Sequence, residues 1–239
     1  MKQAVYFTDL GRMDYKSAWE LQEKMLFENV GKKIPIGQST YPMVADAKNT
    51  STTHHLLFVE HSPVYTLGKS GNIQHVLISE TDRLLKGIEF YKTNRGGDIT
   101  FHGPGQVVAY PIFDLEKFYT DIGKYLRNLE EVVILTLADY GIKGERSKGE
   151  TGVWLDAGVT GNQRKICAIG VRCSRWVTMH GFAFNINTDL NYFDHIIPCG
   201  IPNKKVTSLQ QELGKVMDLE EVKIKLKEKF ELVFSIQFM

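Results

Sequence analysis

The stretch RGGDITFHGPGQVVAY, residues 95–110, begins with an arginine and a glycine-rich segment and ends as an apolar run containing adjacent valines. Glycine reaches positive φ and lets the backbone approach a ligand closely, so such a turn can surround a bound group with main-chain amides. The stretch is not a Walker A motif and lacks the GxGxxG order, so it does not by itself indicate a phosphate site. We expect a ligand-binding turn at residues 95–105, followed by a strand over residues 106–113.

The sequence around this turn predicts an α+β fold. Asp14 and Asp121 each precede an apolar pattern with helical period, so each is expected to cap a helix, the second ending at Gly141. Two capping boxes, which start at Thr207 and Asp218, predict two helices that close the chain. The polar stretch 31–53 is expected to be a long loop. Strands are expected at residues 4–10 (ended by Gly11), 54–60, 64–67, 88–93, 106–113, 152–155, 165–173 and 182–186.

Composition and charge exclude several classes of protein. The 239 residues are 43% hydrophobic and 24% charged, which is typical of an ordered globular protein, and we expect one domain over residues 1–239. A net charge of +1 argues against general nucleic-acid binding. We see no signal peptide, no apolar run of membrane-spanning length and no metal-ligand spacing. We therefore expect a cytoplasmic protein that binds no metal, no nucleic acid and no membrane.

The three cysteines differ in their surroundings. Cys167 and Cys173 lie in a strand-like run, where cysteine usually behaves as a small buried hydrophobe. Cys199 lies between Pro198 and Gly200, which favours an exposed loop with backbone amides free to bind an oxyanion. Cys199 is therefore the candidate nucleophile.

A nucleophilic cysteine needs a group that accepts its proton, and the candidates are Lys165, His102, His180 and His195. Lys165 is the lone cation at the start of an apolar strand, where partial burial would favour the neutral amine. Cys167 follows two residues later and is expected on the same strand face, so a Lys165–Cys167 pair stays open. His102 is equally consistent with a brace inside the glycine turn, and His195 is more consistent with a structural role.

Several motifs, taken together, resemble the lipoyl(octanoyl) transferases. The glycine-rich stretch resembles their signature, and the similarity continues from about residue 56 to residue 209. It includes VYTLGKSGN (64–72), TGVW (151–154), RKICAIGVR (164–172), HGFAFNINTDL (180–190) and PCGI (198–201). Because the motifs occur in the family's order, the resemblance is specific.

The resemblance implies a single mixed-sheet domain like the catalytic domain of biotin and lipoate protein ligases. It places the acyl-thioester nucleophile on Cys199 and the lysine that activates it on Lys165, with no cofactor. The substrate-contacting segments of the family correspond to Arg95, Gly96, Gly97, Asp98, Ile99, Thr100, Phe101, His102, Ala168, Ile169, Gly170, Gly181, Phe182 and Ala183.

The implied reaction transfers an octanoyl group from octanoyl-acyl carrier protein to a lysine of lipoyl domains, in 2-oxoacid dehydrogenase complexes and the glycine cleavage H protein. The alternative on the same fold is an ATP-dependent lipoate or biotin protein ligase, which needs no nucleophilic cysteine. A thiol hydrolase and a non-catalytic binding domain are more distant alternatives. The binding domain would dock an acidic partner through Arg172, Arg175, Lys204 and Lys205.

Overall fold

The structure is a computed structural model that describes residues 2–34, 51–198 and 205–239. Its main element is a mixed sheet in the order β12-β1-β2-β6-β10-β9-β8-β7, with β11 paired to β9. The β1–β2, β1–β12 and β11–β9 pairs are parallel and the others are antiparallel. The strands are β1 Gln3–Met13, β2 His54–His61, β6 Gln106–Ile112, β7 Glu145–Ser147, β8 Glu150–Leu155, β9 Arg164–Ser174, β10 Val177–Asn185, β11 Lys205–Val206 and β12 Ile236–Phe238.

A second, smaller sheet carries the segments that lead into and out of the glycine-rich turn. Its strands are β3 (Val64–Leu67), β4 (Glu89–Lys92) and β5 (Ile99–His102), in the order β4-β3-β5. Short helices border it: α2 (Glu80–Leu85), η1 (Ile73–His75) and η3 (Leu190–His195). Because β4 and β5 lie on either side of β3, residues 93–98 must cross the end of this sheet.

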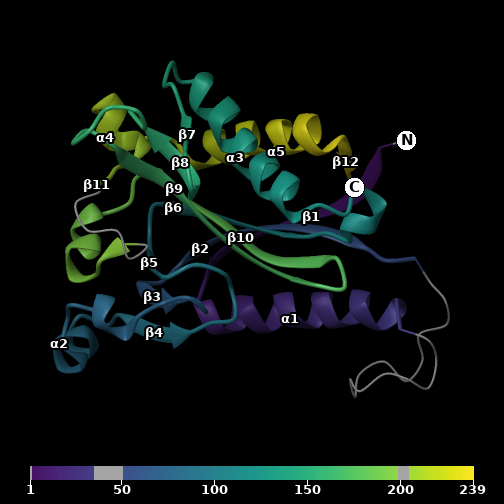
Figure 1. Ribbon diagram of the computed structural model, residues 1–239, viewed down its shortest axis with the longest axis horizontal. Helices are drawn as coiled ribbons and strands as arrows, with labels where there is room; N and C mark the ends of the chain where they lie inside the picture. The colour runs from purple at the N-terminus through teal and green to yellow at the C-terminus, as the bar shows by residue number, and fades with distance from the viewer. Residues whose placement is uncertain (1, 35–50, 199–204) are drawn as a thin grey trace.

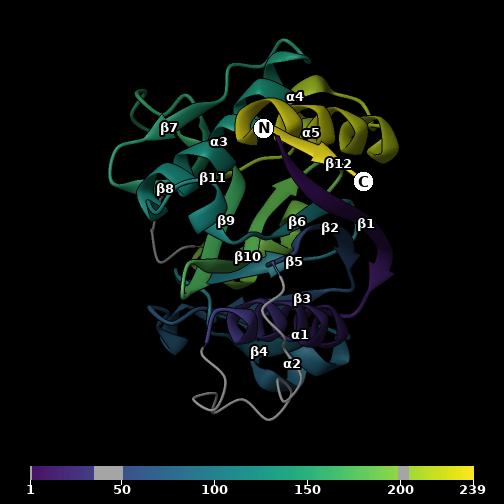
Figure 2. The ribbon, with the colours of Figure 1, turned by 90° about the vertical axis from the view of Figure 1, so that its right-hand side faces the viewer.

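Helices cover both faces of the main sheet (Figure 1). Helices α3 (Ile122–Ala138) and α5 (Leu219–Phe234) lie on one face, and α1 (Tyr15–Lys32) lies on the other. Figure 2 shows the two termini close together, where β12 pairs with β1. The short helices η2 (Leu115–Lys117) and α4 (Leu209–Leu213) complete the described elements. This layering leaves the region between α1, the small sheet and strands β9 and β10 for a site.

The expected α+β class and mixed sheet are confirmed, and so are most expected strands and two caps. The side chains of Asp14 and Asp121 accept hydrogen bonds from the amides of Ser17 and Lys124, so each caps its helix as predicted. The strand prediction was wrong at Gly11, which lies inside β1 at a register shift between Asp9 and Arg12. Glycine at a φ of +60° makes a bulge there without ending the strand.

The capping box at Thr207 was misplaced by one residue. Ser208 caps α4 by accepting a hydrogen bond from the amide of Gln211, while the hydroxyl of Thr207 donates to Glu212. The second box was correct, because Asp218 caps α5. Most of the expected loop 31–53 lies outside the described residues.

The core between the main sheet and α5 depends on stacked aromatic rings. Phe230 is fully buried and stacks on Phe182 with ring centroids 5.9 Å apart. We expect Phe230→Ala to lower the free energy of unfolding by about 3–5 kcal/mol, since it leaves a cavity that the sheet cannot fill. Leu232→Ala, on the exposed side of the same helix, should change it by about 0.5 kcal/mol or less. Urea unfolding measures both, and equal losses would contradict this assignment of the core.

Candidate active site

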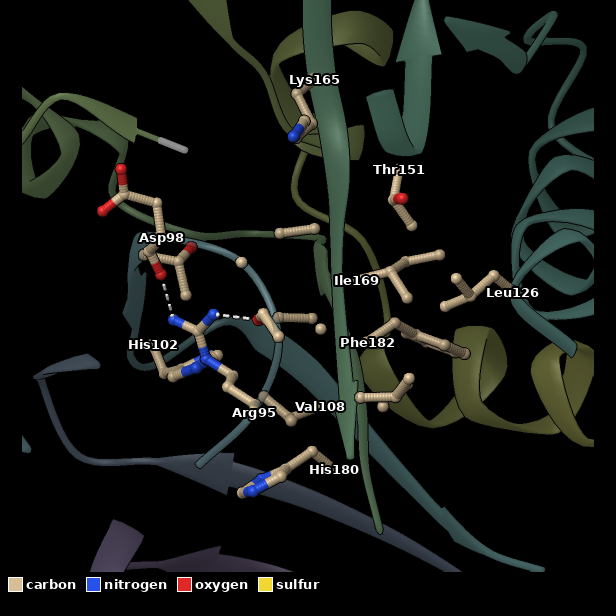
Figure 3. A pocket seen from close by; sticks show the side chains of 18 of the residues that line it. Arg95, Asp98, His102, Val108, Leu126, Thr151, Lys165, Ile169, His180 and Phe182 are labelled. Atoms are coloured by element: carbon tan, nitrogen blue, oxygen red, sulfur yellow. Dashed lines mark hydrogen bonds between the residues drawn. The ribbon is translucent and has the colours of Figure 1, made fainter. Parts of the chain in front are cut away.

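A cavity of about 480 Å³ lies beside strands β9 and β10, with the glycine-rich turn on one side and α3 and the start of β8 on the other. Its volume is within the range typical of small-molecule sites. Strand β8 pairs with β9 only up to Cys167, so the β9 edge that follows faces the turn. Figure 3 shows Arg95, His102 and Val108 on one side of these strands and Leu126, Ile169 and Phe182 on the other. The cavity is lined by Tyr15, Arg95, Gly96, Gly97, Asp98, Ile99, Thr100, His102, Val108, Tyr110, Ile122, Leu126, Gly149, Glu150, Thr151, Lys165, Ala168, Ile169, Gly170, Val171, His180, Gly181, Phe182 and Ala183.

The three segments expected to contact substrate therefore meet around one cavity. Of the residues predicted for substrate binding, Phe101 is the exception, since its ring stacks on Tyr192 with centroids 4.4 Å apart. Phe101 alternates with Thr100 and His102 along β5 and points into the core of the small sheet. The Phe101 side chain therefore stabilises the small sheet and does not line the cavity.

Arg95 fixes the turn from inside. Its guanidinium is buried and donates to the backbone oxygen and hydroxyl of Thr66 on β3, and to the backbone oxygens of Gly96 and Asp98. The amide of Gly96 donates to Val171 of β9 at 2.9 Å. The turn is therefore tied to both sheets, which places Arg95 as a brace of the cavity wall.

Asp98 connects the turn to the segment that precedes Cys199. Its carboxylate accepts hydrogen bonds from the amides of Asn72 and Ile99 and pairs with Nδ1 of His75 at 2.5 Å. The backbone oxygen of His75 in turn accepts a hydrogen bond from the amide of Ile197 at 2.8 Å. Sequence reasoning missed His75, because its partners lie far away in the chain.

The glycines of β9 and β10 are required for close packing. A Cβ on Gly170 would lie 2.8 Å from the backbone oxygen of Gly96, and one on Gly181 would clash with the backbone oxygen of Ala109. Small residues at these positions let the turn and the neighbouring strand approach.

We expect Gly170→Ala to displace the glycine-rich turn from β9, because the contacted atom is backbone and has no rotamer to change. The amide of Gly96 should then exchange with solvent at least about tenfold faster, a difference of about 1.4 kcal/mol in opening. Hydrogen exchange followed by NMR measures this. Gly158→Ala, where an added Cβ meets nothing within 4 Å, is the matched control. Unchanged exchange at Gly96 in both variants would contradict the close contact.

Lys165 lies at one end of the cavity and is buried, with 7% of its surface exposed. Its Nζ lies 4.6 Å from the centroid of the Trp154 ring. Its stem packs where Gly152 has no side chain, since a Cβ there would lie 3.5 Å from Cε of Lys165. Lys165 is therefore buried, as its place at the start of an apolar strand predicts.

The two described cysteines are poor candidates for a thiolate. Cys167 is fully buried in the apolar core, does not line the cavity, and burial raises the pKa of its thiol well above the usual value. Burial also raises the pKa of Cys173. The expected shared face of Lys165 and Cys167 fails because Ile166 is an extra residue in β9, where the register shifts opposite Val153 and Trp154. Cys199 lies outside the described residues.

Three neutral histidines form a buried cluster beside the cavity. Burial lowers the pKa of His61 to about 4 and of His180 to about 3, and it lowers the pKa of His102 well below its usual value. His102 bonds Gln106 and Thr66, which favours the bracing role that the sequence left open. His61 bonds Met13 and Tyr110.

This cluster predicts a loss of stability in mild acid. Below pH 6.5 the unfolded histidines bind protons that the folded ones do not, so the free energy of unfolding falls as pH drops from 7 to 5. Each such histidine should account for about 2 kcal/mol of the loss at pH 5. We expect His61→Gln to reduce that loss by this amount in urea unfolding at the two pH values. His195→Gln, outside the cluster, is the control, and equal pH slopes in all three proteins would contradict the assignment.

The expected basic patch does not form among the described residues. In the backbone register of β11 and β9, Lys205 lies opposite Arg164 at the start of β9. Arg172 lies about 26 Å further along that strand, at about 3.3 Å per residue. Arg172 is paired with Glu23 of α1. Lys204 lies outside the described residues. Within residues 2–34, 51–198 and 205–239 no group of three or more metal-ligating side chains occurs, and no helix is long and apolar enough to cross a membrane.

Comparison with known proteins identifies the family to which the chain belongs. The model of the lipoyl protein ligase A/B catalytic domain matches residues 14–231. The octanoyltransferase of Christiangramia forsetii is 57% identical over 236 residues, covering 98% of this chain and 97% of that protein. The octanoyltransferase of Flavobacterium johnsoniae is 57% identical over 227 residues, covering 95% and 94%. A bipartite lipoate protein ligase from Thermoplasma acidophilum shares the fold, with a TM-score of 0.67 at 15% identity, covering 100% of this chain and 86% of that one.

This chain thus belongs to the lipoyl protein ligase A/B catalytic domain family and has the fold of that family. Within that family it groups with the octanoyltransferases.

Proposed function

We propose that this chain is an acyltransferase of protein lipoylation that moves an octanoyl group from acyl carrier protein to a lysine of lipoyl domains. Cys199 carries the acyl group as a thioester, Lys165 handles the protons, and residues 1–239 act as one catalytic domain. Acceptors are the lipoyl domains of 2-oxoacid dehydrogenase complexes and the glycine cleavage H protein.

The observation that carries the proposal is the convergence of chain segments at Lys165. Pro198, the residue before Cys199, lines a small hollow together with Lys165, Ala168 and Ala183. On the far side of residues 199–204, Val206 of β11 pairs with Lys165. Both ends of the segment that contains Cys199 therefore lie beside the buried lysine. This supports Cys199 as the nucleophile, as does the unfavourable burial of Cys167.

In the first half-reaction, the amine of Lys165 takes the proton of the Cys199 thiol. The thiolate attacks the carbonyl carbon of the octanoyl thioester, and the tetrahedral intermediate collapses with release of the carrier's thiolate, which takes the proton back from Lys165. Products are the acyl-Cys199 thioester and the free carrier thiol. Backbone amides near Cys199 are proposed as the oxyanion donors.

In the second half-reaction, the neutral amine of the acceptor lysine attacks the acyl-Cys199 carbonyl. An amide bond forms, the carbon–sulfur bond breaks, and Lys165 transfers the amine's proton to the departing sulfur. A thioester is exchanged for an amide, which is downhill, so no nucleotide or other cofactor is needed.

The cavity suits an unbranched acyl chain. Beyond Lys165 its wall includes the small and apolar residues Ala168, Gly170, Gly181, Ala183 and Val108, beside the polar groups of the glycine-rich turn. An alkyl chain that enters along these residues loses contact with water, which favours its binding. The chain therefore runs from Lys165 toward His180.

Intact-protein mass spectrometry tests the proposal after the protein is mixed with octanoyl-acyl carrier protein in the absence of ATP. We expect one octanoyl adduct on the wild type and on Cys167→Ser, and none on Cys199→Ser. Lys165→Met, which keeps the buried stem and removes the amine, should acylate at least about 100-fold more slowly, the usual effect of removing a general base. The adduct should discharge onto added lipoyl domain.

Two outcomes would contradict the proposal. An adduct lost only in Cys167→Ser would move the nucleophile into β9. No adduct on any protein, with octanoylation of lipoyl domain by free octanoate and ATP instead, would show an ATP-dependent ligase.

A further inference from the structure

Three buried polar atoms without a hydrogen-bond partner lie together at the end of the cavity away from Lys165. They are the hydroxyl of Tyr15, Nε1 of Trp19 and Nδ1 of His180. The Trp19 ring is adjacent to both of the other rings, with centroids 6.0 Å from Tyr15 and 6.3 Å from His180. Tyr15 and His180 line the cavity and each is only 1% exposed. Unsatisfied buried polar atoms are rare in folded proteins, so such a group needs an explanation.

This cluster lies far from the reactive end. His180 is opposite Val171 of β9, which is about 20 Å along the strand from Lys165 at about 3.3 Å per residue. Figure 3 shows Lys165 and His180 at opposite ends of the group of lining residues, with Val108 between them. An acyl chain bound by its carbonyl at Lys165 points its methyl end toward the cluster.

The hydrogen bonds of His180 determine which of its nitrogens is free to accept. The amide nitrogen of Asn94 donates to the carboxylate of Glu23, so the oxygen of Asn94 faces Nε2 of His180 at 2.8 Å. Nε2 therefore carries the ring proton and Nδ1 is an acceptor. The backbone of His180 is held at a φ of +57°, with its amide donating to Gln22. This strained conformation within a strand fixes the ring's direction.

The three groups offer complementary hydrogen bonds to water, since Nδ1 of His180 accepts, Nε1 of Trp19 donates, and the Tyr15 hydroxyl does either. An alkyl chain long enough to reach Tyr15 and His180, which line the cavity, would exclude water and leave their buried polar atoms without partners. Such a loss costs enough to reduce binding about tenfold or more.

We propose that Tyr15, Trp19 and His180 form a hydrogen-bonding floor that sets the maximum acyl chain length of this cavity. The inference rests on the octanoyl-transfer function proposed above, and it assigns chain-length specificity to α1 and β10. The floor acts by remaining solvated beneath an eight-carbon chain and by excluding longer ones.

The test compares octanoyl, decanoyl and dodecanoyl groups on acyl carrier protein, with kcat/KM measured for transfer to lipoyl domain. Tyr15→Phe and Trp19→Phe each delete one polar group of the floor, and the two are also combined. His180 stays unchanged because its positive φ would strain most replacements. Tyr91→Phe is the control, since Tyr91 stacks on Tyr15 with centroids 5.5 Å apart but does not line the cavity.

We expect the ratio of dodecanoyl to octanoyl kcat/KM to rise about tenfold in the double variant and to stay at the wild-type value in Tyr91→Phe. Calorimetric binding of free octanoate, decanoate and dodecanoate gives the same profile without any transfer. If the wild type transfers no acyl group yet the double variant gains dodecanoate affinity, the floor stands and the proposed function fails. A chain-length profile unchanged by the double variant in both measurements would overturn the floor.

Discussion

The buried guanidinium of Arg95 joins the two sheets, and the cavity exists because of this connection. A buried cation is tolerated only where its donors are satisfied. Here Thr66 of the small sheet and the backbone of the turn accept hydrogen bonds from the guanidinium. The amide of the next residue, Gly96, binds Val171 of the main sheet. Gly170 has no side chain, so this contact can form. The turn thus closes one side of a space whose other side is β9 and β10.

Sequence patterns predicted elements where local chemistry determines structure. Asp14 and Asp121 cap helices through hydrogen bonds within one turn, and strand periodicity located β3 and β6 closely. The strand predictions were wrong where pairing with a neighbouring strand determines the local backbone structure. Gly11 looks like a strand end, yet pairing with β2 carries β1 through it as a bulge. The bulge at Ile166 depends likewise on β8, so strict alternation failed between Lys165 and Cys167.

The candidate site was predictable to the extent that it is made of contiguous motifs. The segments beginning at Arg95, Ala168 and Gly181 all line the cavity, and each lies in a motif that resembles one of the octanoyltransferase family. Tyr15 and Trp19 were missed because, in sequence, they look like the apolar face of an amphipathic helix. Only the packing of α1 against β10 brings Tyr15 to the cavity and Trp19 next to His180.

The positions of charge, apolar surface and polar atoms along the cavity explain how one site can combine reactivity with selectivity. At one end, Lys165 lies beside the two ends of the segment that carries Cys199, the proposed nucleophile. Between the two ends, the glycines and alanines of β9 and β10 would contact an alkyl chain without recognising its length. The proposed floor at Tyr15 and His180 lies at the far end of the cavity, where only a longer chain would reach it. Because His180 is about 20 Å along the sheet from Lys165, selectivity for length can vary without disturbing the proposed catalytic groups.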